Sequence, residues 1–242
     1  METTARPSNG FLSALSADDY ELIRAHLRTV NLPHEAVLAE TGETLKHAYF
    51  PHRGVISLAV KVNGGAKEKD KGEQVQIAMI GRDSVLGALY AAGESRALSS
   101  AVMLVAGTAS VLDLDCLHAA AEQSASLRAS LARHGLAVFA QVQQTAGCNA
   151  AHPVESRLSR CLLQIHDQSG EHRFMLTQEV LARIIGARRN SVSLVANMLQ
   201  QAGHIHYSRG HIQINNLDGL RQSACECYAA VKMQYDRLLE PR

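Results

Sequence analysis

The stretch Leu176–Leu199, LTQEVLARIIGARRNSVSLVANML, predicts two short helices joined by a tight turn. Apolar residues recur at intervals of three and four on both sides of Gly186, as they do when each run forms one face of a helix. Thr177 stands just before the first run, where its hydroxyl can cap the helix. The polar residues after the glycine therefore fall at the start of the second helix. This order of helix, glycine turn and helix is typical of a helix-turn-helix unit.

The side chains at this second helix start have the chemistry of DNA-reading groups. An arginine guanidinium donates two hydrogen bonds to guanine, and an asparagine amide pairs in the same way with adenine. Hydroxyls and backbone N–H groups at a helix start hold phosphates. The following segment HIHYSRGHIQI alternates and turns at Arg209-Gly210, which predicts a two-stranded wing. The predicted DNA-binding residues are Thr177, Gln178, Arg188, Arg189, Asn190, Ser191, Ser193 and Arg209. The alternative interpretation is that the arginines form only a solvated helix end.

Composition divides the rest of the chain into two regions. From Thr29 to Asp113, short apolar runs are broken by glycine, which favours antiparallel strands that form a barrel or sandwich. After Asp115 the sequence is rich in alanine and predicts one long helix. Pro153 cannot extend that helix but suits the first turn of a new one, so we place a hinge there.

The long helix carries an apolar stripe at helical spacing, formed by Leu127, Leu131, Val138 and Val142. We expect this stripe to pair with a second copy of the chain, although packing along its own barrel is the alternative. The expected fold is α+β, with an N-terminal antiparallel β-barrel or jelly roll, a long dimerisation helix and a C-terminal winged helix-turn-helix. The expected domains are residues 1–115, 116–152 and 153–242.

Overall composition is that of a folded globular protein, with 46% apolar and 19% charged residues among 242. The N-terminus METTARPSNGFLSALS lacks the features of a secretory signal, and no apolar run is long enough to cross a bilayer, so we expect a cytoplasmic protein with no membrane partner. Five dispersed cysteines do not frame a disulfide scaffold. Residues 176–214 contain four arginines and one acidic residue, so positive charge is concentrated at this end.

The chain resembles the Crp-Fnr family of bacterial transcription regulators. The segments LTQEVLARIIGARRNSVSLVANMLQQAGHI and YSRGHIQI carry the resemblance, supported by YFPHRGVISL and MIGRDSVLG. It implies a homodimer that binds double-stranded DNA, and it makes RNA polymerase a candidate partner. By this match Arg189 corresponds to the guanine-reading arginine, while Ser191 and Thr177 correspond to phosphate-contacting hydroxyls. Asn190 replaces a residue that is commonly glutamate, which predicts adenine in place of cytosine at that base pair.

The resemblance also places a candidate effector pocket, at Gly87, Ala88, Ser99 and Ser100. Members that bind cAMP carry a Gly-Glu pair and an Arg-Ser-Ala triplet at the corresponding positions. The missing arginine leaves a buried phosphate without a counter-charge, which is costly. We therefore expect no cAMP binding of the usual kind, and no cofactor or metal.

Two alternatives come from other classes of protein. Cys225 and Cys227 with His204, His206 and His211 offer the ligands of a metal- or redox-responsive sensor. Against it, a helix through SACECYAAVKMQYDRL would point the two cysteines about 200° apart. The other alternative is a sensor that signals through protein contacts with an inert helix-turn-helix. Cys148 is a candidate redox switch or a plain buried cysteine. No catalytic constellation is recognisable, so an enzyme is not expected.

Overall fold

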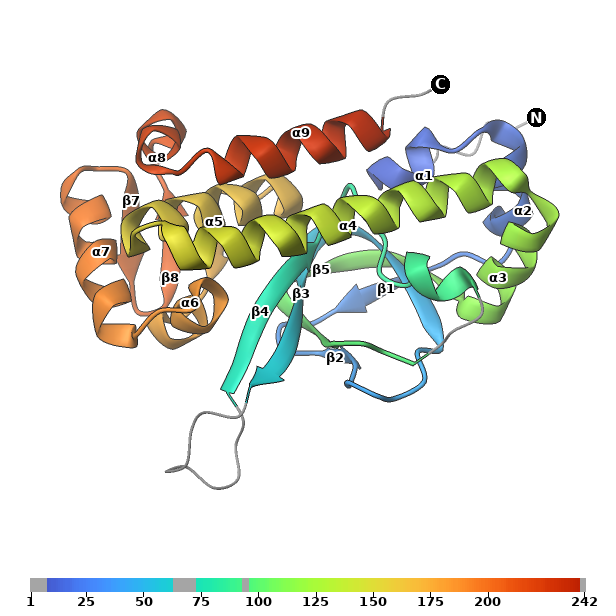
Figure 1. The fold of residues 1–242 in the computed structure, drawn as a ribbon, viewed down its shortest axis with the longest axis horizontal. Helices are drawn as coiled ribbons and strands as arrows, with labels where there is room; N and C mark the ends of the chain where they lie inside the picture. The colour runs from blue at the N-terminus through green and yellow to red at the C-terminus, as the bar shows by residue number, and fades with distance from the viewer. Residues whose placement is uncertain (1–7, 63–72, 93–95, 240–242) are drawn as a thin grey trace.

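A computed structural model of the protein describes residues 8–62, 73–92 and 96–239 (Figure 1). Residues 1–7, part of the expected first domain, lie outside the described residues. The N-terminal part contains an antiparallel sheet and the short helices that cover it. Its elements are α1 (Gly10–Ala14), α2 (Ala17–Arg24), β1 (Arg28–Leu32), β2 (Val37–Ala39), β3 (His47–Val62), β4 (Glu73–Ile80), the 3-10 helix η1 (Ala88–Ala92) and β5 (Ser100–Asp113). The predicted antiparallel architecture is confirmed.

The sheet has the order β1-β5-β3-β4, and β2 also pairs with β5. Its two long strands, β3 and β5, change register between Pro51 and Ile56, and such bulges bend a strand. Gly54 makes this bend possible, because it has a φ of 83° and any side chain there would collide with the Val105 and Ala106 carbonyls of β5. The bent strands enclose a core whose largest fully buried members include Phe50, Ile56, Met103 and Leu112.

Two helices replace the single long helix that composition predicts. They are α3 (Leu114–Gln123) and α4 (Ala125–Ala151). Ser124 separates them in an extended conformation, and its hydroxyl accepts the Leu127 N–H and donates to the Asp19 carboxylate. The helix propensity of the alanine-rich sequence is therefore overridden by a capping serine. In Figure 1, α4 runs along the molecule across the sheet.

The apolar stripe of α4 packs on its own sheet rather than facing outward. Leu127 and Leu131 are buried in the N-terminal core, and Val138 and Val142 pack against it. These four residues therefore do not form the exposed dimer seam that the sequence predicts, because they pack against the sheet of their own chain. The opposite face of α4 leaves Leu136 65% exposed and Phe139 56% exposed.

The C-terminal part begins at Pro153, where the predicted hinge separates α4 from the next helix. Its elements are α5 (Val154–Ser169), β6 (Arg173–Met175), α6 (Gln178–Ile185), α7 (Arg189–Gln201), β7 (Ile205–Ser208), β8 (His211–Ile214), α8 (Leu217–Ser223) and α9 (Cys227–Leu239). The predicted helix-turn-helix and its two-stranded wing are present. The wing sheet also has a third strand, β6, that pairs with β8.

The two parts are packed tightly together. Met79 and Leu104 of the sheet share one apolar cluster with Leu162 of α5 and Ile184 of α6. Helix α9 then leaves the winged helix and lies alongside α4 (Figure 1), where the Gln141 amide donates to the Tyr235 hydroxyl at 2.9 Å. Among the described residues, no helix is both long and apolar enough to cross a membrane.

Candidate nucleic-acid interface

The turn between α6 and α7 is fixed by its caps. The Thr177 hydroxyl accepts the Val180 N–H at 3.2 Å and so begins α6 as predicted. Gly186 ends α6 with a φ of 60°, a left-handed conformation that L-residues adopt at a cost. The chain can therefore reverse within a few residues and start α7 at Arg189.

Helix α7 is buried on one side and exposed on the other at its start. Val192, Val195 and Leu199 pack into the winged-helix core. The predicted DNA-binding residues have the following positions: Arg188, Arg189, Asn190, Thr177 and Arg209 are exposed, whereas Gln178, Ser191 and Ser193 are half-buried. Arg188 occupies the N-cap position without a side-chain cap bond, so the first N–H groups of α7 keep their capacity to bind an anion.

A buried arginine that the sequence did not predict donates hydrogen bonds to the backbone at the turn. Arg157 of α5 donates from Nη1 to the carbonyls of Asn149 at 3.1 Å and Ile185 at 3.0 Å, with Gly186 at 3.4 Å. These carbonyls belong to the C-terminal ends of α4 and α6, where a cation is favoured by the helix dipoles. Arg157 therefore connects the hinge to the helix-turn-helix. Its sequence signal is weak, because the same face of α5 also carries the buried polar residues Arg160 and Gln164.

The wing presents a second group of polar side chains. Arg209 and Gly210 both have positive φ, as a two-residue hairpin turn requires. A shallow hollow beside the turn is lined by Arg173, His206, Ser208, Arg209, His211 and Gln213. Arg173 was not predicted, because a strand as short as β6 leaves little alternation to detect.

The histidine and cysteine group proposed for a metal sensor is corrected by the structure. His206 and His211 lie on the wing, and the His204 ring packs against Gly219. None of the three joins Cys225 and Cys227, which lie instead near Cys148 and His152. The helical argument against the cysteine pair is also wrong, because Cys225 lies in the turn between α8 and α9.

The candidate effector pocket is partly formed. Gly87, Ala88 and Ser99 line a cavity of about 50 Å³ together with His134. Ser100 does not line it, because its hydroxyl donates to the Ala59 carbonyl on β3. Ligand pockets usually have about 300 Å³ or more.

Within the described residues, the lining of this cavity does not offer a cation to a phosphate. Its titratable groups are His134 and Tyr90. Burial lowers the pKa of His134 to about 4, so the imidazole is neutral at physiological pH. The chemistry therefore does not fit a cyclic nucleotide in this conformation.

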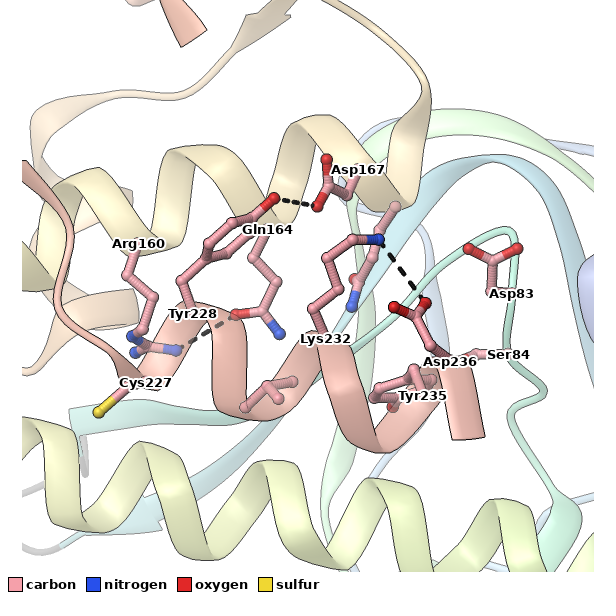
Figure 2. Close-up of a pocket in the computed structure, with 12 residues that line it drawn as sticks. Asp83, Ser84, Arg160, Gln164, Asp167, Cys227, Tyr228, Lys232, Tyr235 and Asp236 are labelled. Atoms are coloured by element: carbon pink, nitrogen blue, oxygen red, sulfur yellow. Dashed lines mark hydrogen bonds and ion pairs between the residues drawn. The ribbon is translucent and has the colours of Figure 1, made fainter. Parts of the chain in front are cut away.

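A second hollow, of about 60 Å³, lies between α5, α9 and the loop that carries Asp83 (Figure 2). The Tyr228 hydroxyl donates to Asp167 at 2.6 Å, and Lys232 lies 3.7 Å from Asp236. Burial raises the pKa of Asp83. The first contact joins α9 to α5, whereas the second lies within α9 itself.

Together the fold and the exposed α7 start define a winged helix-turn-helix protein with an N-terminal antiparallel sheet domain. Residues 156–223 match the model of the Crp-like helix-turn-helix domain. The resemblance to Crp-Fnr regulators that the sequence motifs indicate is confirmed for this domain and for the fold.

Three solved structures illustrate the likeness. FixK2 from Bradyrhizobium japonicum has a TM-score of 0.67 at 12% identity, covering 82% of this chain and 98% of its own. A CRP-family transcriptional regulator from Thermus thermophilus has a TM-score of 0.61 at 17% identity, with 81% and 96% covered. The c-di-GMP-responsive regulator CLP from Xanthomonas campestris has a TM-score of 0.57 at 16% identity, with 82% and 99% covered. No curated protein matches the sequence.

Proposed function

We propose that this protein is a DNA-binding transcription regulator that acts in the cytoplasm as a homodimer on a pseudo-palindromic operator. The observation that carries the proposal is the exposed start of α7, where Arg188, Arg189 and Asn190 project from a helix held by a buried face. A helix of this kind enters the major groove with its first residues toward the base edges.

The side chains divide into two roles. Arg189 reads guanine through its two parallel N–H donors, and Asn190 reads adenine through its amide. Thr177, Gln178, Ser191 and Ser193 contact phosphates and set the register. Arg209 at the wing tip adds a phosphate contact beside the groove, and Arg188 adds one at the N-cap of α7.

Homodimer formation is supported by the outer face of α4. Exposed residues recur there at the alternating three- and four-residue spacing of a coiled-coil seam: Ala125, Ala129, Ala132, Leu136, Phe139, Gln143, Ala146 and Ala150. The alanines allow two helices to approach closely, and Leu136 and Phe139 are large apolar groups otherwise left in water. Pairing of two α4 helices would give the two α7 helices that a symmetric operator requires.

The proposed division of labour follows the domains 1–115, 116–152 and 153–242. The first domain senses an effector or supports the dimer, the second dimerises, and the third binds DNA and is the one available to RNA polymerase. Because the sheet and the winged helix share an apolar cluster, an effector acts by changing the stability of that packing. The small apolar cavity and the missing arginine argue that such an effector is not cAMP held in the usual way.

The test is selection of binding sites from a random DNA pool by the purified protein at stated salt. Recovery of a two-fold symmetric site is the expected result. The Arg189→Ala variant is then measured on that site and on single-base changes of it. We expect a loss of about 1–3 kcal/mol together with relaxed specificity at one base pair.

Arg183→Ala is the matched control, because Arg183 is exposed on α6 and outside the predicted contact set. An equal loss for Arg189→Ala on every sequence would make Arg189 a phosphate contact instead. Failure to shift any DNA, with or without cell extract as a source of effector, would contradict DNA binding and favour a sensor that works through protein contacts.

A further inference from the structure

Three cysteines and a histidine converge at the hinge from distant parts of the sequence. Cys148 lies near the end of α4, and His152 is the residue that ends that helix. Cys225 comes from the turn between α8 and α9, and Cys227 is the first residue of α9. The Sγ atoms of the cysteines and a ring nitrogen of His152 all lie within 4.8 Å of one another. The three cysteines are buried and form a cluster of their own.

The distances suit a tetrahedral ion. Cys148 Sγ and Cys225 Sγ are 3.5 Å apart, and Cys227 Sγ is 3.6 Å from His152 Nδ1. Around Zn²⁺, bonds of about 2.3 Å to sulfur and about 2.0 Å to nitrogen place two thiolates about 3.8 Å apart, and a thiolate and an imidazole nitrogen about 3.5 Å apart. These two pairs of donors thus already have nearly the spacing that two corners of a zinc tetrahedron require, and all four donors lie within 4.8 Å of one another.

Neighbouring polar side chains orient two of the donors, His152 and Cys227, as such side chains do in metal sites. His152 directs Nδ1 toward Cys227, while its Nε2 lies 3.1 Å from the Glu226 carboxylate. A carboxylate on the second ring nitrogen fixes the tautomer in which the first can bind a metal. Gln144 donates from Nε2 to Cys227 Sγ at 3.0 Å, a contact that also stabilises a thiolate.

A buried cation completes the charge balance. Three thiolates around Zn²⁺ carry a net charge of −1. Arg160 of α5 is buried, and among the residues that the structure describes it has no carboxylate partner; it donates to the neutral Gln164. Its Nε atom has no hydrogen-bond partner within the described part of the chain. Figure 2 shows the guanidinium at the same end of the hollow as Cys227.

We propose that Cys148, His152, Cys225 and Cys227 bind one Zn²⁺ ion that fastens the C-terminal segment to the end of α4. Binding replaces the three thiol protons with the metal and leaves the imidazole neutral. Two ligands precede Pro153 and two follow α8, so the ion closes a loop that contains the helix-turn-helix segment 156–223. The site holds the orientation of that domain relative to α4.

The test uses the full-length protein, purified under reducing conditions, freed of metal with a chelator and reloaded with Co²⁺. We expect one Co²⁺ per chain, the intense visible absorption of tetrahedral thiolate-bound Co²⁺, and loss of that absorption when Zn²⁺ is added. Zinc should also protect Cys148, Cys225 and Cys227 from alkylation, as mapped by mass spectrometry. These readouts do not involve DNA, so their failure is distinguishable from failure of the proposed function.

Variants locate the site. Cys225→Ser should abolish the tetrahedral spectrum, whereas Cys116→Ser, which changes a free cysteine of α3 outside the cluster, should leave it intact. Glu226→Gln should weaken Zn²⁺ binding about 10-fold through His152, and Glu226 is exposed, so this variant should fold. Substoichiometric metal in the reduced wild type, a disulfide between Cys148 and Cys225 in the freshly purified protein, or bound iron and sulfide would overturn the zinc assignment.

Discussion

The buried His134 should make the stability of the protein fall sharply in mild acid. Its Nε2 accepts the Val85 N–H at 3.2 Å, and its ring stands edge-on to Phe11 and Tyr235. Its Nδ1 has no partner among the described residues. Protonation would place a positive charge in this apolar site without an acceptor, which is why burial lowers the pKa to about 4.

The sign of the effect follows from the two pKa values. The unfolded chain takes up a proton near the ordinary value of 6.5, whereas the folded His134 resists it until about pH 4. Stability is therefore complete above about pH 7 and declines as the pH falls between the two values. At about 1.4 kcal/mol per pKa unit, the loss amounts to about 2 kcal/mol at pH 5 and about 3 kcal/mol once the folded group titrates.

Urea unfolding between pH 7.5 and 4.5, at one protein concentration, measures this loss. His134→Gln keeps an acceptor for the Val85 N–H but does not titrate, so its stability should fall by about 2 kcal/mol less than that of the wild type between pH 7.5 and 5. His26→Gln, at an exposed position, is the control and should follow the wild type. If the His134→Gln and wild-type curves stay parallel over the whole range, the buried neutral imidazole is not responsible for the acid loss.

Three further changes test the packing that supports the interface. Phe139→Glu should weaken self-association in analytical ultracentrifugation by about 100-fold or more, because two exposed rings lose their burial; an unchanged dimer would place the seam elsewhere. Arg157→Met should lower the free energy of unfolding by about 2–3 kcal/mol in urea titrations, because helix-end carbonyls lose their buried donor. Arg183→Met should change it little. Equal effects of the two substitutions would mean that the hydrogen bonds of Arg157 do not stabilise the fold. Gly186→Ala should destabilise the protein by about 1 kcal/mol because of the left-handed φ at this position. Gly147→Ala, where a side chain meets open space within a helix, should stabilise it by about 0.5–1 kcal/mol. A change of stability in the same direction for both variants in thermal unfolding would contradict the conformational argument.

The helix-turn-helix was predictable because its determinants are local. The cap at Thr177, the glycine at the turn and the apolar intervals of α6 and α7 all act within a few residues. The wing turn at Arg209-Gly210 is equally local. These elements have the predicted bounds to within a residue or two.

The face of α4 that meets the sheet was not predictable in the same way. One side of the helix carries Leu127 and Leu131 and the other Leu136 and Phe139, and periodicity alone does not say which side a sheet will cover. The break at Ser124 was not predicted, because a serine within an alanine-rich run does not by itself end a helix. The hydrogen bond from its hydroxyl to the Asp19 carboxylate comes from a residue far away in the sequence.

By itself, the sequence determined the two helices and the turn of the helix-turn-helix, its wing and the break before α5 at Pro153, because caps, turns and periodicity are short-range. Only the tertiary structure decided which face of α4 remains free and which side chains join the cysteine cluster. Cys148 and Cys225 are 77 residues apart, and they meet because α9 returns along α4. The position of α9 along α4 depends on contacts between residues far apart in the sequence, so no local pattern predicts it.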